Sequence, residues 1–254
     1  MRIFFITKKN LIYFAIFILS LFLSSILYFS FANSNNDIRY PYVNQNDIYE
    51  NKERIAYLTF DDGPNKTITP KVLDILNKNN VKANFFIIGK YAEEYPEIVK
   101  DIYDNGHFIG NHSYSHNNSI LYKDKETFFS EIEKTDKAIG KAIGNSNFRS
   151  HIFRCPNGSM SKIKYSQKQK CLKCLAEIDY TFVDWNVLNN DSMRKYTKNE
   201  LLNNLKKSSS NKGSIIILMH DSGDVNKTYD VLEGSINYLK DEGYEFRTFY
   251  DFIQ

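Results

Sequence analysis

Hydrophobic residues form one long uninterrupted run near the N-terminus and many short runs after it. The long run, residues 11–32, contains no charged residue and is preceded by Lys8 and Lys9. A helix rises about 1.5 Å per residue, so this run would extend over roughly 33 Å and cross the hydrocarbon core of a bilayer. The sequence therefore predicts a membrane-spanning anchor, with residues 1–10 on the cytoplasmic side and the rest of the chain outside.

Cleavage of this segment is an open alternative. Ser30 and Ala32 form a small-x-small site, and cleavage after Ala32 would release a secreted protein. The apolar run is longer than the hydrophobic region of a typical signal peptide, so we favour an uncleaved single-pass anchor. Residues 33–52 are rich in Asn and lack a hydrophobic period. They are expected to form an extracytoplasmic linker to a domain at residues 53–254.

Short apolar runs alternate with amphipathic stretches throughout residues 53–254. The expected strands are 55–60, 83–88, 108–110, 152–153, 180–184, 214–219 and 245–248. The expected helices are 69–78, 95–105, 125–143, 161–176, 198–208 and 229–242. Alternation of this kind predicts parallel strands joined by crossover helices, and hence one α/β domain built on a sheet or barrel.

Charge and cysteine content exclude two classes of protein. Lys and Arg total 33 against 30 Asp and Glu, and three of the basic residues lie in the first ten positions, so the remaining chain is formally neutral. A neutral domain lacks the clustered positive charge that nucleic-acid binding requires. The cysteines Cys155, Cys171 and Cys174 are too few for a disulfide-stapled fold. Stability is therefore expected to come from a packed core.

Polar residues with catalytic potential follow five of the expected strands. They are Asp61 and Asp62 after the first strand, His112 and His116 after the third, Arg154 after the fourth, Asp184 and Asp191 after the fifth, and His220 and Asp221 after the sixth. Parallel α/β folds collect their chemistry at the carboxyl ends of the strands. A functional site is therefore expected at this edge of the sheet.

Two histidines four residues apart, His112 and His116, can bind one metal ion through their imidazoles. A carboxylate from the pair Asp61 and Asp62 would complete a set that leaves positions open for water, as catalytic zinc requires. The other carboxylate would stay free as a base. Such an ion lowers the pKa of water from about 15.7 toward 7, which implies hydrolysis without a covalent intermediate. His220 is then a candidate general acid.

Five motifs in this order, TFDDGP, HSYSH, FRCPNGS, DWNVLNND and ILMH, resemble those of the polysaccharide deacetylases of carbohydrate esterase family 4. The resemblance extends over roughly residues 53–254. It implies a distorted (β/α) barrel with a divalent metal ion, usually zinc, that removes acetyl groups from N-acetylated sugars. The metal ligands it implies are Asp62, His112 and His116, with Asp61 as catalytic base and His220 as catalytic acid.

The resemblance implies further roles beside the metal. Arg154 would orient Asp61, Asp191 would tune His220, Leu218 would line the pocket for the acetyl methyl group, and Asn157 would offer its N–H to the oxyanion. Trp185, the only tryptophan, is either a platform for a sugar or a residue of the core or of a wall of the site. Asn157 stands where many members have an aromatic residue, and Ser192 where a tryptophan often follows the acid. Both changes indicate a subgroup of the family.

We therefore expect a membrane-anchored, outward-facing deacetylase whose substrate is GlcNAc in peptidoglycan. One alternative keeps the site and changes the substrate to a chitooligosaccharide, an exopolysaccharide or an O-acetyl xylan. Another is a glycan-binding relative without catalysis. Two imidazoles and one carboxylate suit Zn, Co, Ni or Fe, and zinc is the expected ion. The sequence indicates no nucleic acid or protein partner.

Overall fold

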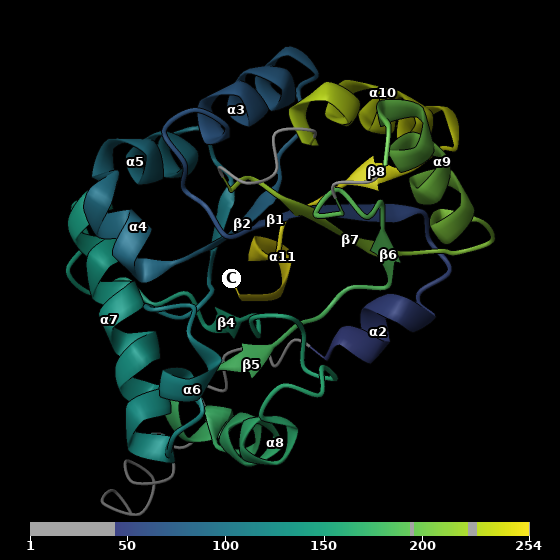
Figure 1. Ribbon diagram of the computed structural model, residues 1–254. Coiled ribbons are helices and arrows are strands. Elements are labelled where there is room, and N and C mark those ends of the chain that lie inside the picture. Colours follow the sequence, from purple (N-terminus) through teal and green to yellow (C-terminus); the bar gives the residue numbers. More distant parts are fainter. Residues whose placement is uncertain (1–43, 194–195, 223–227, 254) are drawn as a thin grey trace, which may run out of the picture. The chain divides into compact units, whose positions relative to one another are not determined.

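A curled sheet of eight strands, all paired in parallel, is the centre of the structure, a computed structural model that describes residues 44–193, 196–222 and 228–253. The strands are β1 (Ile55–Asp61), β2 (Asn84–Ile87), β3 (Phe108–Asn111), β4 (Ile152–Phe153), β5 (Thr181–Phe182), β6 (Val187–Leu188), β7 (Ile215–His220) and β8 (Glu245–Phe246). Their order is β5-β4-β3-β2-β1-β7-β6, with β8 paired to β1. The predicted α/β barrel-type architecture is confirmed, and Figure 1 shows the strands arranged around a common interior.

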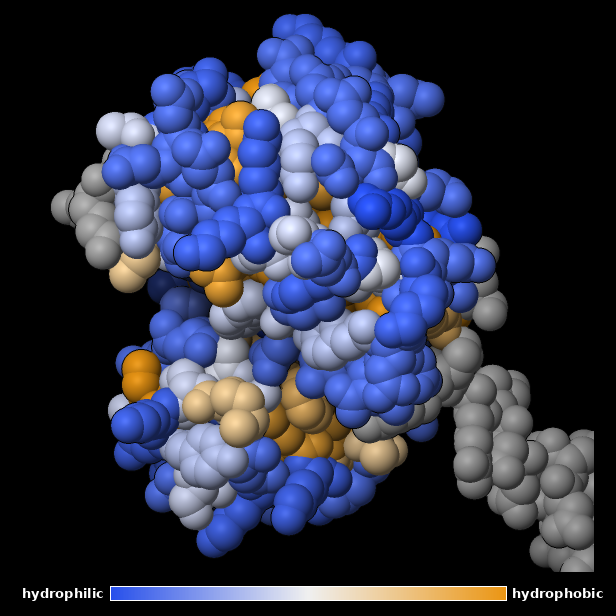
Figure 2. Space-filling model, turned by 90° about the vertical axis from the view of Figure 1, so that its right-hand side faces the viewer, coloured by the Kyte–Doolittle hydropathy of each residue, from blue (hydrophilic) through white to orange (hydrophobic). Residues whose placement is uncertain are grey.

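Helices surround the sheet on its outer side (Figure 1). They are α2 (Gln45–Glu50), α3 (Thr69–Lys78), α4 (Gly89–Glu94), α5 (Pro96–Asp104), α6 (Asn118–Leu121), α7 (Lys125–Ile143), α8 (Tyr165–Lys173), α9 (Lys198–Ser209) and α10 (Thr228–Asp241). A short 3-10 helix, Leu175–Ile178, follows α8, and α11 (Tyr250–Ile253) lies inside the curl of the sheet. The side of Figure 1 that carries α2 and α9 faces the viewer in Figure 2 and is mainly hydrophilic, as expected of amphipathic helices.

Local sequence signals account for the limits of the long helices. At the start of α7, the Asp124 carboxylate accepts a hydrogen bond from the backbone N–H of Thr127. The helix ends at Gly144, whose φ of 74° lies in the left-handed region that glycine adopts readily. Thr197 and Glu200 form a reciprocal capping box at the start of α9. These caps explain why the expected and observed limits of both helices agree within one residue.

Alternation along the strands divides the core into two layers. On β1, Ala56, Leu58 and Phe60 belong to the cluster between the sheet and the outer helices. Ile55 and Tyr57 belong to the cluster inside the curl. The next residues on the inner face of β1 are therefore Thr59 and Asp61. The interior thus changes from apolar at the start of the strand to polar at its end.

Phe249 closes the apolar half of the interior. Its ring stacks on Tyr57 at 5.2 Å between centroids and meets the edges of Phe86 and Phe108 at 6.1 and 5.6 Å. Helix α11 follows directly and adds Phe252, 5.8 Å from Tyr57. This aromatic layer seals the start of the strands, so the interior is open to chemistry only at their carboxyl ends.

Several short elements differ from the sequence expectation. Residues 45–50 form α2 rather than linker, and Ile48 is only 3% exposed because it packs into the inner cluster. Six residues are too few to display a helical period. The short helices α4, α6 and α11 were not predicted for the same reason, and strand β6 was not predicted because it has only two residues. Helix α8 begins only at Tyr165, because Lys164 has a φ of 51°.

The predicted membrane-spanning segment, residues 11–32, and residues 33–43 of the predicted linker lie outside the described residues. Within the described ranges, every helix is too short or too polar to cross a membrane.

Removing the Phe249 ring should destabilise the domain strongly. We expect Phe249→Ala to lower the free energy of unfolding by about 3–5 kcal/mol, because it leaves a cavity among three aromatic side chains. Tyr103→Ala is the control, since Tyr103 is 41% exposed, and should cost less than about 1 kcal/mol. Urea unfolding of both variants measures the difference. An equal loss of unfolding free energy in the two variants would contradict the conclusion that Phe249 closes the apolar half of the interior.

Candidate metal and catalytic site

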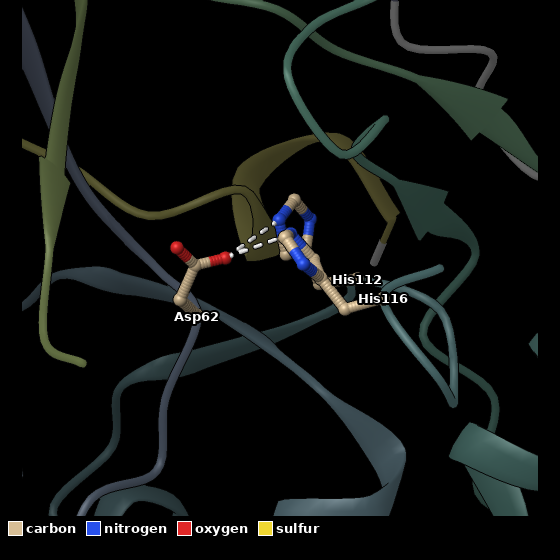
Figure 3. A group of neighbouring side chains, drawn as sticks. All are labelled: Asp62, His112 and His116. Carbon is tan, nitrogen blue, oxygen red and sulfur yellow. Dashed lines mark ion pairs between the residues drawn. The ribbon is translucent and has the colours of Figure 1, made fainter. Parts of the chain in front are cut away.

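Asp62, His112 and His116 gather at the carboxyl ends of β1 and β3 (Figure 3). Oδ1 of Asp62 lies 3.2 Å from Nε2 of His112 and 3.0 Å from Nε2 of His116. One donor atom from each residue therefore falls within 4.8 Å of the others. Figure 3 shows both imidazoles directed at the same carboxylate oxygen. The structure thus brings together the three residues that the sequence predicted as metal ligands.

A change of backbone conformation turns Asp62 toward the site. Adjacent side chains of a regular strand point to opposite faces, so Asp61 and Asp62 would normally diverge. Asp62 follows the last residue of β1 and has a φ of 73°, in the left-handed region. Gly63 comes next, and a Cβ there would lie 2.3 Å from Oδ2 of Asp221. The tight turn therefore requires glycine and lets both carboxylates face one site.

The donor set fits a catalytic divalent ion. Nδ1 of His112 lies 2.9 Å from the carbonyl oxygen of Arg154, so Nδ1–H can donate there and leave the lone pair of Nε2 for a metal. Burial alone would raise the pKa of Asp62, but the hydrogen bonds and charges of His112 and His116 hold it well below its usual range. Two imidazoles and an ionised carboxylate leave coordination positions open for water and substrate.

Arg154 anchors Asp61 from within the curl. The Arg154 side chain is fully buried, and its Nη1 lies 2.9 Å from Oδ1 of Asp61. The same guanidinium donates to Oγ1 of Thr59 and to the carbonyl oxygens of Val183 and Asp184. Its Cζ also lies 4.0 Å from the centre of the Phe86 ring. These contacts hold one oxygen of Asp61 and leave Oδ2 facing the histidines, 3.9 Å from Nε2 of His112.

His220 and Asp191 form a second charged pair. Nδ1 of His220 lies 2.8 Å from Oδ1 of Asp191, and Oδ2 of Asp191 accepts from the backbone N–H of His220 and from Oγ1 of Thr228. Burial lowers the pKa of His220, but the hydrogen bond and charge of Asp191, with the charges of Asp61 and Asp62, raise it to about 9. Because β1 and β7 pair Asp61 with His220, the two groups flank one site. His220 is therefore charged at neutral pH and can donate a proton.

The remaining predicted residues surround this centre in different ways. Asn157 is exposed, with a φ of 64°, and its Oδ1 accepts a hydrogen bond from Nδ2 of Asn118 at 2.9 Å. Trp185 packs on the inner cluster and on Gly158, where a Cβ would lie 2.9 Å from the ring. The wall is thus the role of Trp185 that the packing favours. Leu218 is half-buried on the inner face of β7, and its contact with substrate remains a prediction.

Sequence reasoning assigned no role to several residues that support the site. The Asp184 carboxylate accepts hydrogen bonds from the backbone N–H and the hydroxyl of Ser159, which ties the FRCPNGS turn to the DWNVLNND segment. Thr59 and Thr228 complete the partners of Arg154 and Asp191. Thr59 and Asp184 lie inside the motifs TFDDGP and DWNVLNND, and this position is the sequence signal from which a supporting role could have been inferred.

Asp221 is a buried acid directly behind the turn after β1. Oγ1 of Thr69 donates to its Oδ2 at 2.6 Å, while its Oδ1 has no hydrogen-bond partner among the described residues. Burial, together with the negative charges of Asp62 and Asp61, raises the pKa of Asp221 to about 7. The hydrogen bond from Thr69 acts in the opposite direction and lowers it. A carboxyl that is partly protonated at neutral pH adds less than a full negative charge to the site.

The cysteines take no part in this centre. Cys155, Cys171 and Cys174 are all free thiols. Burial raises the pKa of Cys155 to about 12, which keeps it protonated and unreactive. Cys155 lies in a hydrophobic cluster, where its thiol contributes to packing.

Comparison with known proteins gives one consistent family. A family model for polysaccharide deacetylase matches residues 48–180. A peptidoglycan-N-acetylglucosamine deacetylase of Bacillus cereus is 36% identical over 202 residues, which cover 78% of this chain and 67% of that relative. The peptidoglycan-N-acetylmuramic acid deacetylase PdaA of Bacillus subtilis is 30% identical over 202 residues, which cover 80% of this chain and 72% of that relative.

Solved structures agree with the fold. The structure of a Streptococcus mutans CE4 esterase matches with a TM-score of 0.72 and 29% identity, over 82% of this chain and 91% of that chain. This similarity supports the barrel that the motifs implied.

Replacing Asp191 should lower the pKa of His220. We expect Asp191→Asn to lower that pKa from about 9, because burial remains while the hydrogen bond to an anion and the charge of Asp191 are lost. NMR titration of the histidine ring protons in chelator-treated protein measures the shift. Asp230→Asn, an exposed acid on α10, is the control and should leave it unchanged. A His220 pKa near 9 in Asp191→Asn would contradict the assigned cause.

Proposed function

Because the chain belongs to the polysaccharide deacetylase family, a family of hydrolases, we propose that it removes N-acetyl groups from GlcNAc residues of peptidoglycan with the help of a divalent metal ion. The observation that carries the proposal is the meeting of three groups at one edge of the sheet. These are the Asp62, His112 and His116 cluster, the Asp61–Arg154 pair and the His220–Asp191 pair. The name of the Bacillus cereus relative supports the choice of substrate.

Asp62, His112 and His116 would hold the ion, and zinc is the one we propose. The same donor set also suits Co, Ni or Fe. When bound, a divalent ion lowers the pKa of water and polarises the acetamide carbonyl. His112 is prepared for this role, because its Nδ1 is engaged by the carbonyl oxygen of Arg154.

Asp61 and His220 would move the two protons of the hydrolysis. The free oxygen of Asp61 accepts a proton from the attacking water, while Arg154 holds the other oxygen in place. His220, charged because of Asp191, donates its proton to the departing amine nitrogen. The products are acetate and a glucosamine residue. One base and one charged acid on adjacent strands can thus take the proton from water and supply the proton to the amine.

The carbonyl and methyl groups of the substrate would be received by other residues. The backbone N–H of Asn157 donates a hydrogen bond to the oxyanion, and such a donor typically lowers the barrier by about 3–4 kcal/mol. Leu218, beside His220 on the inner face of β7, borders the methyl group. The hydrogen bond from Asn118 to the Asn157 side chain supports this role, because it holds the loop that presents the N–H.

We further propose that residues 11–32 anchor the protein in the membrane with the catalytic domain outside. The uncharged run and the lysines before it support this orientation. Peptidoglycan lies on the same side of the membrane, so the anchor and the proposed substrate are consistent with each other.

N-acetylmuramic acid in the same polymer is a second candidate substrate. It is favoured by the 30% identity to PdaA, whose name states that sugar. The site chemistry is the same for both sugars, so the choice depends on which acetylated residue fits beside Asn157.

Acetate release tests the proposed function. We expect the full-length chain to release acetate from purified peptidoglycan, to lose this activity with a chelator, and to regain it when zinc is restored. Analysis of the hydrolysed product for glucosamine or muramic acid distinguishes the two sugars. GlcNAc oligomers and acetyl-xylan are the comparison substrates. Activity that survives complete chelation would contradict the metal dependence.

Asp61→Asn tests the assignment of the base. We expect turnover to fall by about 10²–10⁴-fold, because the amide cannot accept the proton. Zinc affinity should change little, since Asp61 is not in the ligand cluster. Calorimetric zinc titration and acetate release measure the two properties separately. Retained turnover, or loss of zinc binding, would each refute the division of roles between Asp61 and Asp62.

A further inference from the structure

The turn from His112 to His116 has an unusual backbone. Ser113 has a φ of 65° and His116 a φ of 54°, so two residues other than glycine occupy the left-handed region within five positions. Steric contacts with Cβ disfavour this conformation, and it persists only where surrounding groups hold it. The turn carries two of the three predicted ligands, so its support determines where their imidazoles lie.

Glu131 contacts this turn from α7. Its side chain is on the buried stripe of the helix, and the residue is only 5% exposed. Oε2 of Glu131 accepts hydrogen bonds from the backbone N–H of Ser115 at 2.8 Å and from its hydroxyl at 2.7 Å. One buried carboxylate oxygen therefore fixes the residue immediately before His116.

A second chain of hydrogen bonds joins α7 to the start of the turn. Oδ1 of Asp136 accepts from Nδ2 of Asn111, and Oδ1 of Asn111 accepts from the backbone N–H of Ser113. Oγ of Ser113 accepts in turn from the backbone N–H of His116 at 3.1 Å. Helix α7 thus holds both sides of the turn, and Glu131 provides the contact nearest to His116.

We propose that Glu131 is a positioning residue for the metal site, which it preorganises by fixing the turn that carries His112 and His116. The inference rests on the proposed metal dependence. Residues that orient ligands without touching the ion typically change metal affinity by 10- to 100-fold when they are replaced. Glu131 therefore contributes to metal binding although it contacts neither the ion nor the substrate.

Zinc titration of the full-length chain tests the proposal. We expect Glu131→Ala to raise the zinc Kd at least tenfold over the unaltered chain, measured by calorimetry after chelator treatment. Glu131→Gln retains an oxygen that can accept both hydrogen bonds, so its zinc Kd should lie between those of the unaltered chain and Glu131→Ala. Glu133→Ala is the matched control, because Glu133 is on the same helix but exposed and paired with Lys137. Its Kd should stay within twofold of the unaltered chain.

Circular dichroism of the chelator-treated variant separates positioning from a general loss of structure, because saturating zinc would also stabilise a partly unfolded variant. A metal-free Glu131→Ala variant that is folded should still show the raised zinc Kd, and its acetate release should recover to near the unaltered level at saturating zinc. A folded Glu131→Ala variant with unchanged Kd would overturn the inference and leave the proposed function standing. Failure of the unaltered chain to bind zinc would instead overturn the proposed metal dependence.

Ser115→Ala keeps the test open if Glu131→Ala does not fold. It removes the hydroxyl, which donates to Glu131 and accepts from the backbone N–H of Asn117, and it retains the backbone N–H of Ser115 that donates to Glu131. We expect the zinc Kd to rise about threefold, because one of two hydrogen bonds is lost. An unchanged Kd in this variant would count against the proposal.

Discussion

The burial of Arg154 is the constraint on which the rest of the structure depends. A guanidinium removed from water must have its charge and all its donors compensated. Arg154 directly follows β4 but pairs with Asp61 and Thr59 on β1, which is separated from β4 by two strands in the sheet order. The pair can form only because the sheet curls and brings the inner faces of β1 and β4 toward each other. The charge that orients the Asp61 carboxylate therefore also requires the barrel shape.

The length of an apolar run decided which strands could be predicted, and the polar residues that end the long strands indicated where the site lies. The apolar runs of β1 and β7 are long, so their sequence gives both their limits and the polar residues that end them. Parallel pairing then sets Asp61 beside His220 without further information. Strand β6 and helices α2 and α11 were not predicted, because they are only two to six residues long and their sequences show no clear period. They depend on tertiary contacts such as the burial of Ile48.

Residue types indicated the metal site, but the direction of the side chains did not follow from spacing alone. Strand alternation would separate Asp61 from Asp62, and only the left-handed turn at Asp62 brings them together. The partners of the ligands were harder still to predict. Glu131 is far from every motif, and its signal is an acid on the apolar stripe of α7. A buried acid at a core position is informative, since it must have partners, but the sequence does not say which.

The acceptor at Nδ1 separates the roles of the histidines. Nδ1 of His112 faces the backbone carbonyl oxygen of Arg154, which fixes the orientation of the ring. Its Nε2 is therefore free to bind a metal. Nδ1 of His220 faces the Asp191 carboxylate, whose negative charge favours the protonated imidazole. Two histidines at nearby strand ends thus have different partners at Nδ1, a backbone carbonyl oxygen for His112 and a buried carboxylate for His220. This difference is consistent with the proposal that His112 binds a metal ion and His220 delivers a proton.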